Sequence, residues 1–176
     1  MFSQALDRLL LLALLLSAGM ASASERFDAV AVFPAENLSG RGIPAAEVRQ
    51  FLIDQFADQG VRVLGDEALD AFIARHRVRY GAGIDAATAE LLREETGVEG
   101  VVIVSVELSS EDVPPKVALF ARLISIQAAP VVVWAEDAGM AGDDSPGLFD
   151  LGLVNDYQEV LKRVLDRVGD SLVSWL

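Results

Sequence analysis

The stretch VEGVVIVSVEL, residues 98–108, decides the fold class because it is apolar at nearly every position. A strand with one face in solvent alternates apolar and polar residues, whereas a strand that is covered on both faces is apolar at nearly every position. The sequence therefore predicts a central strand whose sheet carries helices on both faces.

Three further elements follow this strand. Residues 116–126 and 130–140 are rich in Val, Ile and Leu, and the short linker 127–129 between them predicts a β-hairpin. Residues 155–175 place apolar side chains at steps of three and four, which predicts one long amphipathic helix.

The segments before residue 98 alternate between strands and helices. Strands are predicted at 27–33 and 61–64, and a helix at 44–59. Asp66 is predicted to cap a second helix, and Asp85 to cap a third helix that ends at Gly97. The element order is β-α-β-α-α-β-β-β-α. We therefore predict a single domain over residues 24–176 of the α/β class, an α+β sandwich with a mixed sheet and flanking helices.

The first 23 residues have the pattern of a secretory signal. A short polar start with Arg8 precedes an apolar run over 9–16, and the segment ends in the small residues Ala21-Ser22-Ala23. The run is shorter than the roughly 20 residues that cross a bilayer. We expect cleavage before Ser24 and a soluble mature chain in the periplasm. The chain has no cysteine, so we expect neither a disulfide nor a lipid anchor on Cys, and no direct membrane anchor.

The composition argues against several classes of function. Fourteen Lys and Arg residues against 27 Asp and Glu residues give a net charge of −13, which disfavours nucleic acids and anionic membranes as partners. With one histidine and no cysteine, the chain cannot build a His-rich metal site or a cysteine nucleophile, and we expect no cofactor. Acidic pairs such as Glu94-Glu95 are expected on solvated surfaces.

One basic cluster, Arg75, Arg77 and Arg79 around His76, leaves two alternatives open. Cationic residues are favoured at a helix C-terminus by the helix dipole, and this position matches that rule. The second alternative is a contact with an anion or an acidic partner.

Residues 30–48, VAVFPAENLSGRGIPAAEV, raise the question of a nucleotide site, because 40–45 match the spacing G-x-G-x-x-G/A. In a dinucleotide-binding fold the first glycine follows the strand directly. Here six residues separate Phe33 from the first glycine, Glu36 adds negative charge, and Pro44 removes a helix N–H donor. The segment instead favours a strand at the edge of the sheet, followed by a recognition loop.

Two segments are candidate surfaces for a partner protein. In the loop after the first strand, the candidate residues are Glu36, Asn37, Leu38 and Arg41. In 145–155 the loop is unusually apolar, and exposed apolar residues mark partner sites; the alternative is burial beneath the last helix. The candidate residues there are Leu148, Phe149 and Leu151.

Four segments resemble the motifs of a known family and occur in the same order as in that family. They are 30–42, which contains the Asn-Leu-Ser-Gly turn, and then 56–73, 83–106 and 119–139. They are similar to the TolB N-terminal-like and curli-secretion (CsgG-like) domains of the bacterial envelope. Ser105 stands at a serine of the family pattern, and the closing hairpin matches at Arg122, Leu123, Ile124 and Trp134.

The resemblance implies an α/β domain that binds proteins and carries out no chemistry. Members of this fold group serve as secretion-pore subunits, as periplasmic modules of trans-envelope complexes and as activators of peptidoglycan synthases. We expect a non-enzymatic periplasmic adaptor whose partners are cell-envelope proteins. The alternatives are an activator of a peptidoglycan synthase, a small-ligand or nucleotide-binding domain, and a hydrolase that uses carboxylates such as Glu36 and Asp66.

Overall fold

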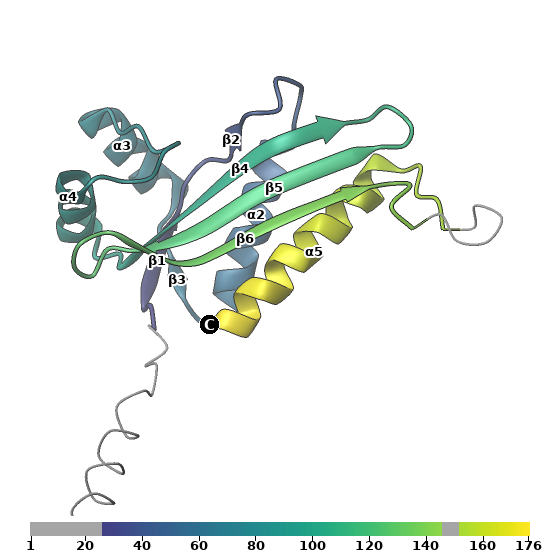
Figure 1. Ribbon diagram of the computed structural model, residues 1–176. Coiled ribbons are helices and arrows are strands. Elements are labelled where there is room, and N and C mark those ends of the chain that lie inside the picture. Colours follow the sequence, from purple (N-terminus) through teal and green to yellow (C-terminus); the bar gives the residue numbers. More distant parts are fainter. Residues whose placement is uncertain (1–25, 146–151) are drawn as a thin grey trace, which may run out of the picture.

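The computed structural model describes residues 26–145 and 152–176 (Figure 1). The predicted signal and the candidate residues Leu148, Phe149 and Leu151 lie outside the described residues. The elements are β1 (Ala29–Val32), β2 (Glu36–Asn37), α2 (Ala45–Asp58), β3 (Arg62–Val63), α3 (Asp66–His76), α4 (Ala86–Thr96), β4 (Gly100–Ser110), β5 (Lys116–Ser125), β6 (Val131–Ala141) and α5 (Tyr157–Trp175).

The sheet is mixed and has the strand order β3-β1-β4-β5-β6, with β2 paired to β4. Strand β1 is parallel to both β3 and β4, whereas β4, β5 and β6 form an antiparallel meander. Strand β2 continues the line of β1 along β4, because Val32 pairs with Val102 and Glu36 with Ser105. The predicted fold class and the predicted hairpin are confirmed.

The prediction of an edge position for the first strand is wrong. Strand β1 lies between β3 and β4, and its four residues are all buried. The predicted loop also contains an additional strand, because Glu36 and Asn37 form β2. Both features depend on parallel pairing with β4, which lies more than sixty residues away in the sequence and leaves no local pattern.

Helix boundaries follow the local signals closely. The carboxylate of Asp85 accepts a hydrogen bond from the Thr88 backbone N–H at 2.9 Å, and Gly97 ends α4 in a left-handed conformation. The hydrogen bonds from Thr88 hold the pKa of Asp85 below its ordinary value. The predicted cap at Asp66 is wrong by one position, because Gly65 is the N-cap and Asp66 is the first helical residue.

Two hydrophobic cores lie on opposite faces of the sheet. The larger core contains Val102 and Val104 of β4 and packs against α2 and α5, whereas Val101 and Ile103 face α3 and α4. Figure 1 shows α5 running along the whole hairpin, with α3 and α4 gathered at one end of the sheet. The expected cover on both faces therefore holds for the first part of β4, up to Val106; Glu107 and Leu108 are exposed.

Gly142 joins the end of β6 to the segment before α5, and we predict that Gly142→Ala destabilises the protein by about 2 kcal/mol or more. A Cβ at this position would lie 2.0 Å from the backbone oxygen of Val154, which must then move. Urea unfolding measures the effect. Gly42→Ala is the matched control, since a Cβ there meets no atom within 4 Å. Equal stability of the two variants would contradict the described packing of 142 against 154.

Candidate functional site

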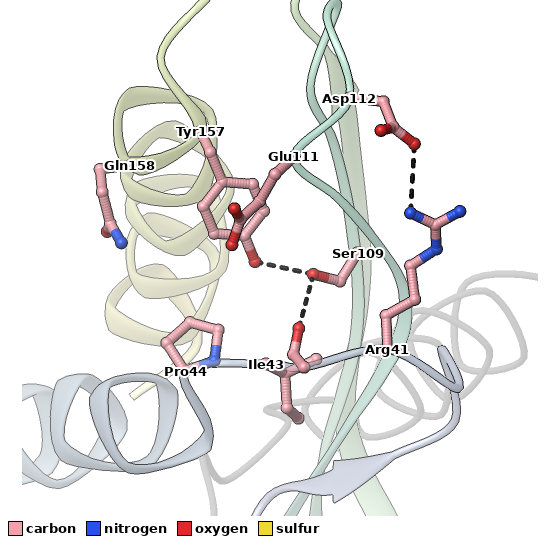
Figure 2. Close-up of a pocket in the computed structure, with 9 residues that line it drawn as sticks. Arg41, Ile43, Pro44, Ser109, Glu111, Asp112, Tyr157 and Gln158 are labelled. Atoms are coloured by element: carbon pink, nitrogen blue, oxygen red, sulfur yellow. Dashed lines mark hydrogen bonds and ion pairs between the residues drawn. The ribbon is translucent and has the colours of Figure 1, made fainter.

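A pocket of about 720 Å³ opens where three segments meet: the connection from β2 to α2, the β4–β5 turn and the start of α5 (Figure 2). These segments are distant in sequence, and β4 and α2 position them at one end of the sheet. The lining residues are Arg41, Gly42, Ile43, Pro44, Ser109, Glu111, Asp112, Tyr157 and Gln158.

The loop that forms one wall is shaped by Asn37. Its side-chain oxygen accepts hydrogen bonds from the backbone N–H of Ser39 at 3.1 Å and from the Ser39 hydroxyl at 2.8 Å. Its side-chain amide donates to the carbonyl of Arg41 at 2.7 Å. Gly40 adopts φ of 69°, a conformation in which a side chain is strained. The Asn-Leu-Ser-Gly sequence therefore builds a turn, and Asn37 is a structural residue of that turn.

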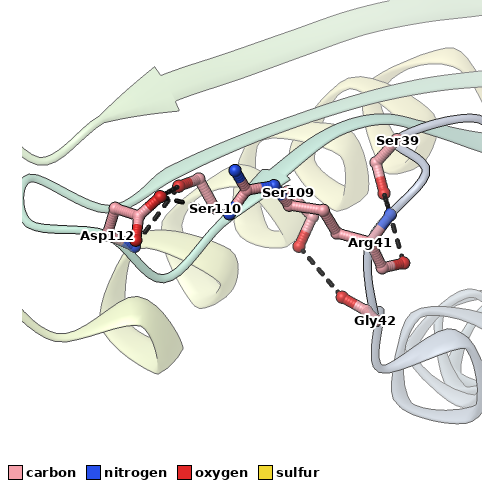
Figure 3. Close-up of polar contacts among 6 residues, drawn as sticks. All are labelled: Ser39, Arg41, Gly42, Ser109, Ser110 and Asp112. Carbon is pink, nitrogen blue, oxygen red and sulfur yellow. Dashed lines mark hydrogen bonds and ion pairs between the residues drawn. The ribbon is translucent and has the colours of Figure 1, made fainter.

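Arg41 spans the mouth of the pocket and forms an ion pair with Asp112 at 3.1 Å (Figure 3). Asp112 also accepts a hydrogen bond from the Ser110 hydroxyl at 3.1 Å. The Arg41 and Asp112 side chains are 61% and 78% exposed. Exposed pairs of this kind stabilise a protein by at most about 1 kcal/mol. Either partner can therefore exchange this contact for one with another molecule at small cost.

A buried polar contact holds the three segments together at the floor of the pocket. The Ser109 hydroxyl lies 2.9 Å from the Tyr157 hydroxyl and 3.4 Å from the carbonyl oxygen of Gly42. Ser109 is 2% exposed, so both hydrogen bonds are shielded from water. Neither Ser109 nor Tyr157 stands out in the sequence, because Tyr157 lies in the apolar stripe of α5 and Ser109 in a polar stretch.

The other candidate residues of the loop lie away from the pocket. Glu36 is half-buried and accepts a hydrogen bond from the Ser105 hydroxyl at 3.4 Å. Leu38 is 57% exposed, and its backbone N–H donates to the carbonyl of Val106 at 2.9 Å. Of the four candidate residues in this loop, only Arg41 lines the pocket.

The pocket lining offers hydrogen-bonding and charged groups. Its hydroxyls, those of Ser109 and Tyr157, bond to each other, and its Asp112 carboxylate is paired with Arg41. Among residues 26–145 and 152–176, no group of three or more His, Cys, Asp or Glu side chains could hold a metal ion. Within the same ranges, no helix combines the length and apolar character that a membrane span needs.

Glu36 and Asp66, the two carboxylates considered for a hydrolase, contact different partners. Asp66 pairs with Arg49 at 2.9 Å, and Arg49 also donates to the carbonyl of Val32 at 2.9 Å. In the described part of the chain, no hydrogen bond joins Asp66 to Glu36. The two residues therefore serve different local contacts.

The basic cluster is tied to α4. Arg75 and His76 contact the two carboxylate oxygens of Glu95 at 2.7 and 2.8 Å. Both residues lie in the last turn of α3, where the helix dipole favours the positive charge of Arg75, and this position supports the helix C-terminus alternative. Glu94 and Glu95 are both exposed, as expected for this acidic pair, and Glu95 in addition connects α4 to the end of α3.

Solved structures of low sequence identity share this fold. Lipoprotein GNA1162 from Neisseria meningitidis is 15% identical, with a TM-score of 0.56 over 82% of this chain and 99% of that chain. The LpoB C-terminal domain from Salmonella enterica is 14% identical, with a TM-score of 0.54 over 70% and 90%. The PelC dodecamer from Paraburkholderia phytofirmans is 16% identical, with a TM-score of 0.50 over 82% and 87%.

The likeness establishes the fold. No model of a protein family matches the sequence, and no curated protein matches it. The resemblance to TolB N-terminal-like and CsgG-like domains therefore stays a prediction.

We predict that Asn37→Ala lowers the free energy of unfolding by about 1–2 kcal/mol, since it removes three hydrogen bonds of about 0.5–1.5 kcal/mol each at an exposed site. Arg41→Gln removes one exposed ion pair and is expected to change it by less than about 1 kcal/mol. Urea unfolding of both variants tests the distinction. A smaller loss for Asn37→Ala than for Arg41→Gln would show that Asn37 does not organise the loop.

Proposed function

We propose that this chain is a non-enzymatic protein-interaction module of a cell-envelope assembly or secretion complex, and that it acts in the periplasm. The observation that carries the proposal is the pocket beside Arg41. Its walls are fixed by Asn37 and by the Ser109–Tyr157 contact, while the Arg41–Asp112 pair lies exposed at its mouth. Rigid walls and an exchangeable ion pair suit recognition of a polar protein surface.

The comparisons support an envelope setting. One of the similar structures is named a lipoprotein, and the likeness extends over 99% of that chain. The signal-like start of the sequence supports export, and the scarcity of His and Cys supports a role without catalysis. The partner is expected to be an envelope protein with neutral or basic contact surfaces, because the net charge of −13 repels acidic ones.

A second candidate function is activation of a peptidoglycan synthase. The structural similarity to the LpoB C-terminal domains of two organisms, with TM-scores of 0.54 and 0.52, supports this alternative. Co-purification with a peptidoglycan synthase, followed by assay of that synthase with and without the purified chain, distinguishes an activator from an adaptor with another partner.

A small-ligand site is the remaining candidate, because the pocket volume of about 720 Å³ lies within the range of small-molecule sites. Thermal unfolding with nucleotides, sugars and peptidoglycan fragments tests it, since a ligand that binds only the folded state raises the melting temperature. Unchanged melting temperatures would remove this candidate.

We predict that Arg41→Glu lowers recovery of the partner by about tenfold after crosslinking in cells, because the substitution removes the hydrogen-bond donors that Arg41 offers at the mouth of the pocket. The variant remains folded, because the lost ion pair is exposed. Arg75→Glu is the matched control: Arg75 is 62% exposed and ion-paired like Arg41, but it lies on α3.

Two results would refute the proposal. One is equal loss of partner with Arg41→Glu and Arg75→Glu, which would indicate a general charge effect. The other is turnover of a substrate by the purified chain, combined with no envelope protein among its crosslinked products.

A further inference from the structure

Among the elements of residues 26–145 and 152–176, no helix covers one face of the sheet beyond Ser105. Strand β4 is buried through Val106, and its next residues, Glu107 and Leu108, are exposed. Strand β5 alternates in the same region: Val117 and Leu119 are buried on the face of α2 and α5, whereas Ala118 and Phe120 on the opposite face are half-buried. In Figure 1, α3 and α4 lie at the other end of the sheet.

The pairing of the strands shows which residues share this uncovered face. Leu108 pairs with Ala118, and Ala118 pairs with Gly139. Leu38 directly follows β2 and lies two positions after Glu36, whose carboxylate meets Ser105. Its backbone N–H donates to the carbonyl of Val106, so the pairing with β4 continues and alternation places Leu38 on the same face as Glu36. We call this surface the open face; its residues are Leu38, Leu108, Ala118, Phe120 and Gly139.

The open face is apolar and shallow. Leu38, which directly follows β2, is 57% exposed and Leu108 of β4 is 45% exposed, and contiguous exposed apolar residues mark binding surfaces. The centre of the open face is shallow because Gly139 has no side chain and Ala118 has only a methyl group. A Cβ at Gly139 would lie 3.4 Å from the Cβ of Ala118. The Arg122 guanidinium lies 5.7 Å from the centroid of the Phe120 ring and donates to the carbonyl of Gly81 at 2.6 Å. The ring of Phe120 is therefore held in place at one edge of the open face.

The charges around the open face are mainly acidic. Asp137 pairs with Phe120 across the strands, and Glu107 is the extra residue of the bulge opposite Ala118. Both are exposed, and in residues 26–145 and 152–176 no ion pair engages either carboxylate. Two cations of β5 lie on the same face: Lys116, which is exposed, and Arg122, which is half-buried and donates to the carbonyl of Gly81. An acidic border around apolar residues complements a partner that carries basic residues beside an apolar stripe.

We propose that the open face binds a basic amphipathic helix of the envelope partner. Four strands, β2, β4, β5 and β6, cross this region and span about 14 Å at 4.8 Å per strand, which accommodates one helix of about 10 Å diameter. Such a helix extends the layer that α3 and α4 begin, just as α2 and α5 cover the opposite face. The inference rests on the proposed function and names the kind of segment that the partner contributes.

Site-specific photo-crosslinking in cells tests this inference with the full chain. A photo-reactive phenylalanine is placed at Leu108 on the open face, at Gln158 in the pocket, and at Leu91 on α4 as control; Leu91 is 39% exposed. Mass spectrometry then identifies the partner segment attached at each position. We expect Leu108 to attach to a segment with apolar residues at steps of three and four and with Lys or Arg beside them.

Charge reversal provides the second measurement. Glu107→Lys and Asp137→Lys together are expected to lower the crosslink yield from Leu108 by about tenfold, through loss of attraction for the basic helix. Glu90→Lys with Glu94→Lys on α4 is the matched control and is expected to leave the yield unchanged. Circular dichroism confirms that each variant is folded.

The outcomes separate this inference from the proposed function. A crosslink to an envelope protein from Gln158 but not from Leu108 overturns the open-face helix and leaves the interaction module intact. Attachment from Leu108 to an acidic or extended segment, or to a second copy of this chain, also overturns the helix. Absence of any crosslink from both positions overturns both proposals.

Discussion

The length of β4 is the constraint on which the rest of the structure depends. This strand has eleven residues and pairs with β1 and β2 on one side and with β5 on the other. Its first half needs cover on both faces, which α2, α3, α4 and α5 provide. Its second half extends past α3 and α4. The open face and the pocket both arise from this excess length, because the strand carries the turn and β2 beyond the two-sided core.

Strong periodic patterns made much of the fold predictable from the sequence. The apolar run of β4, the hairpin and the stripe of α5 each describe burial within one segment, and local sequence encodes that burial directly. The position of β1 inside the sheet was not predictable in this way, since it follows from parallel pairing with β4 and β3. Strand β2 was missed because two residues that pair through their backbone leave no side-chain pattern.

The candidate site was predictable only where the loop sequence is distinctive. Asn37 and Arg41 were found because Asn-Leu-Ser-Gly stands out as a turn, yet the two residues have different roles. The side chain of Asn37 forms its hydrogen bonds within the loop, while the side chain of Arg41 extends to the mouth of the pocket. Ser109 and Tyr157 were missed, because their contact joins residues 48 positions apart and each looks ordinary in its own segment.

The same short loop connects the two surfaces. Leu38 contributes to the open face, Arg41 contributes to the pocket, and Asn37 bonds to the carbonyl of Arg41 from the strand that precedes both. A loop held this way presents an apolar and a charged contact in fixed relation, so less conformational entropy is lost when a partner binds. The turn that suggests a phosphate-binding loop in the sequence therefore has a different physical role. It fixes the spacing between the open face and the pocket, the two surfaces that we propose for partner binding.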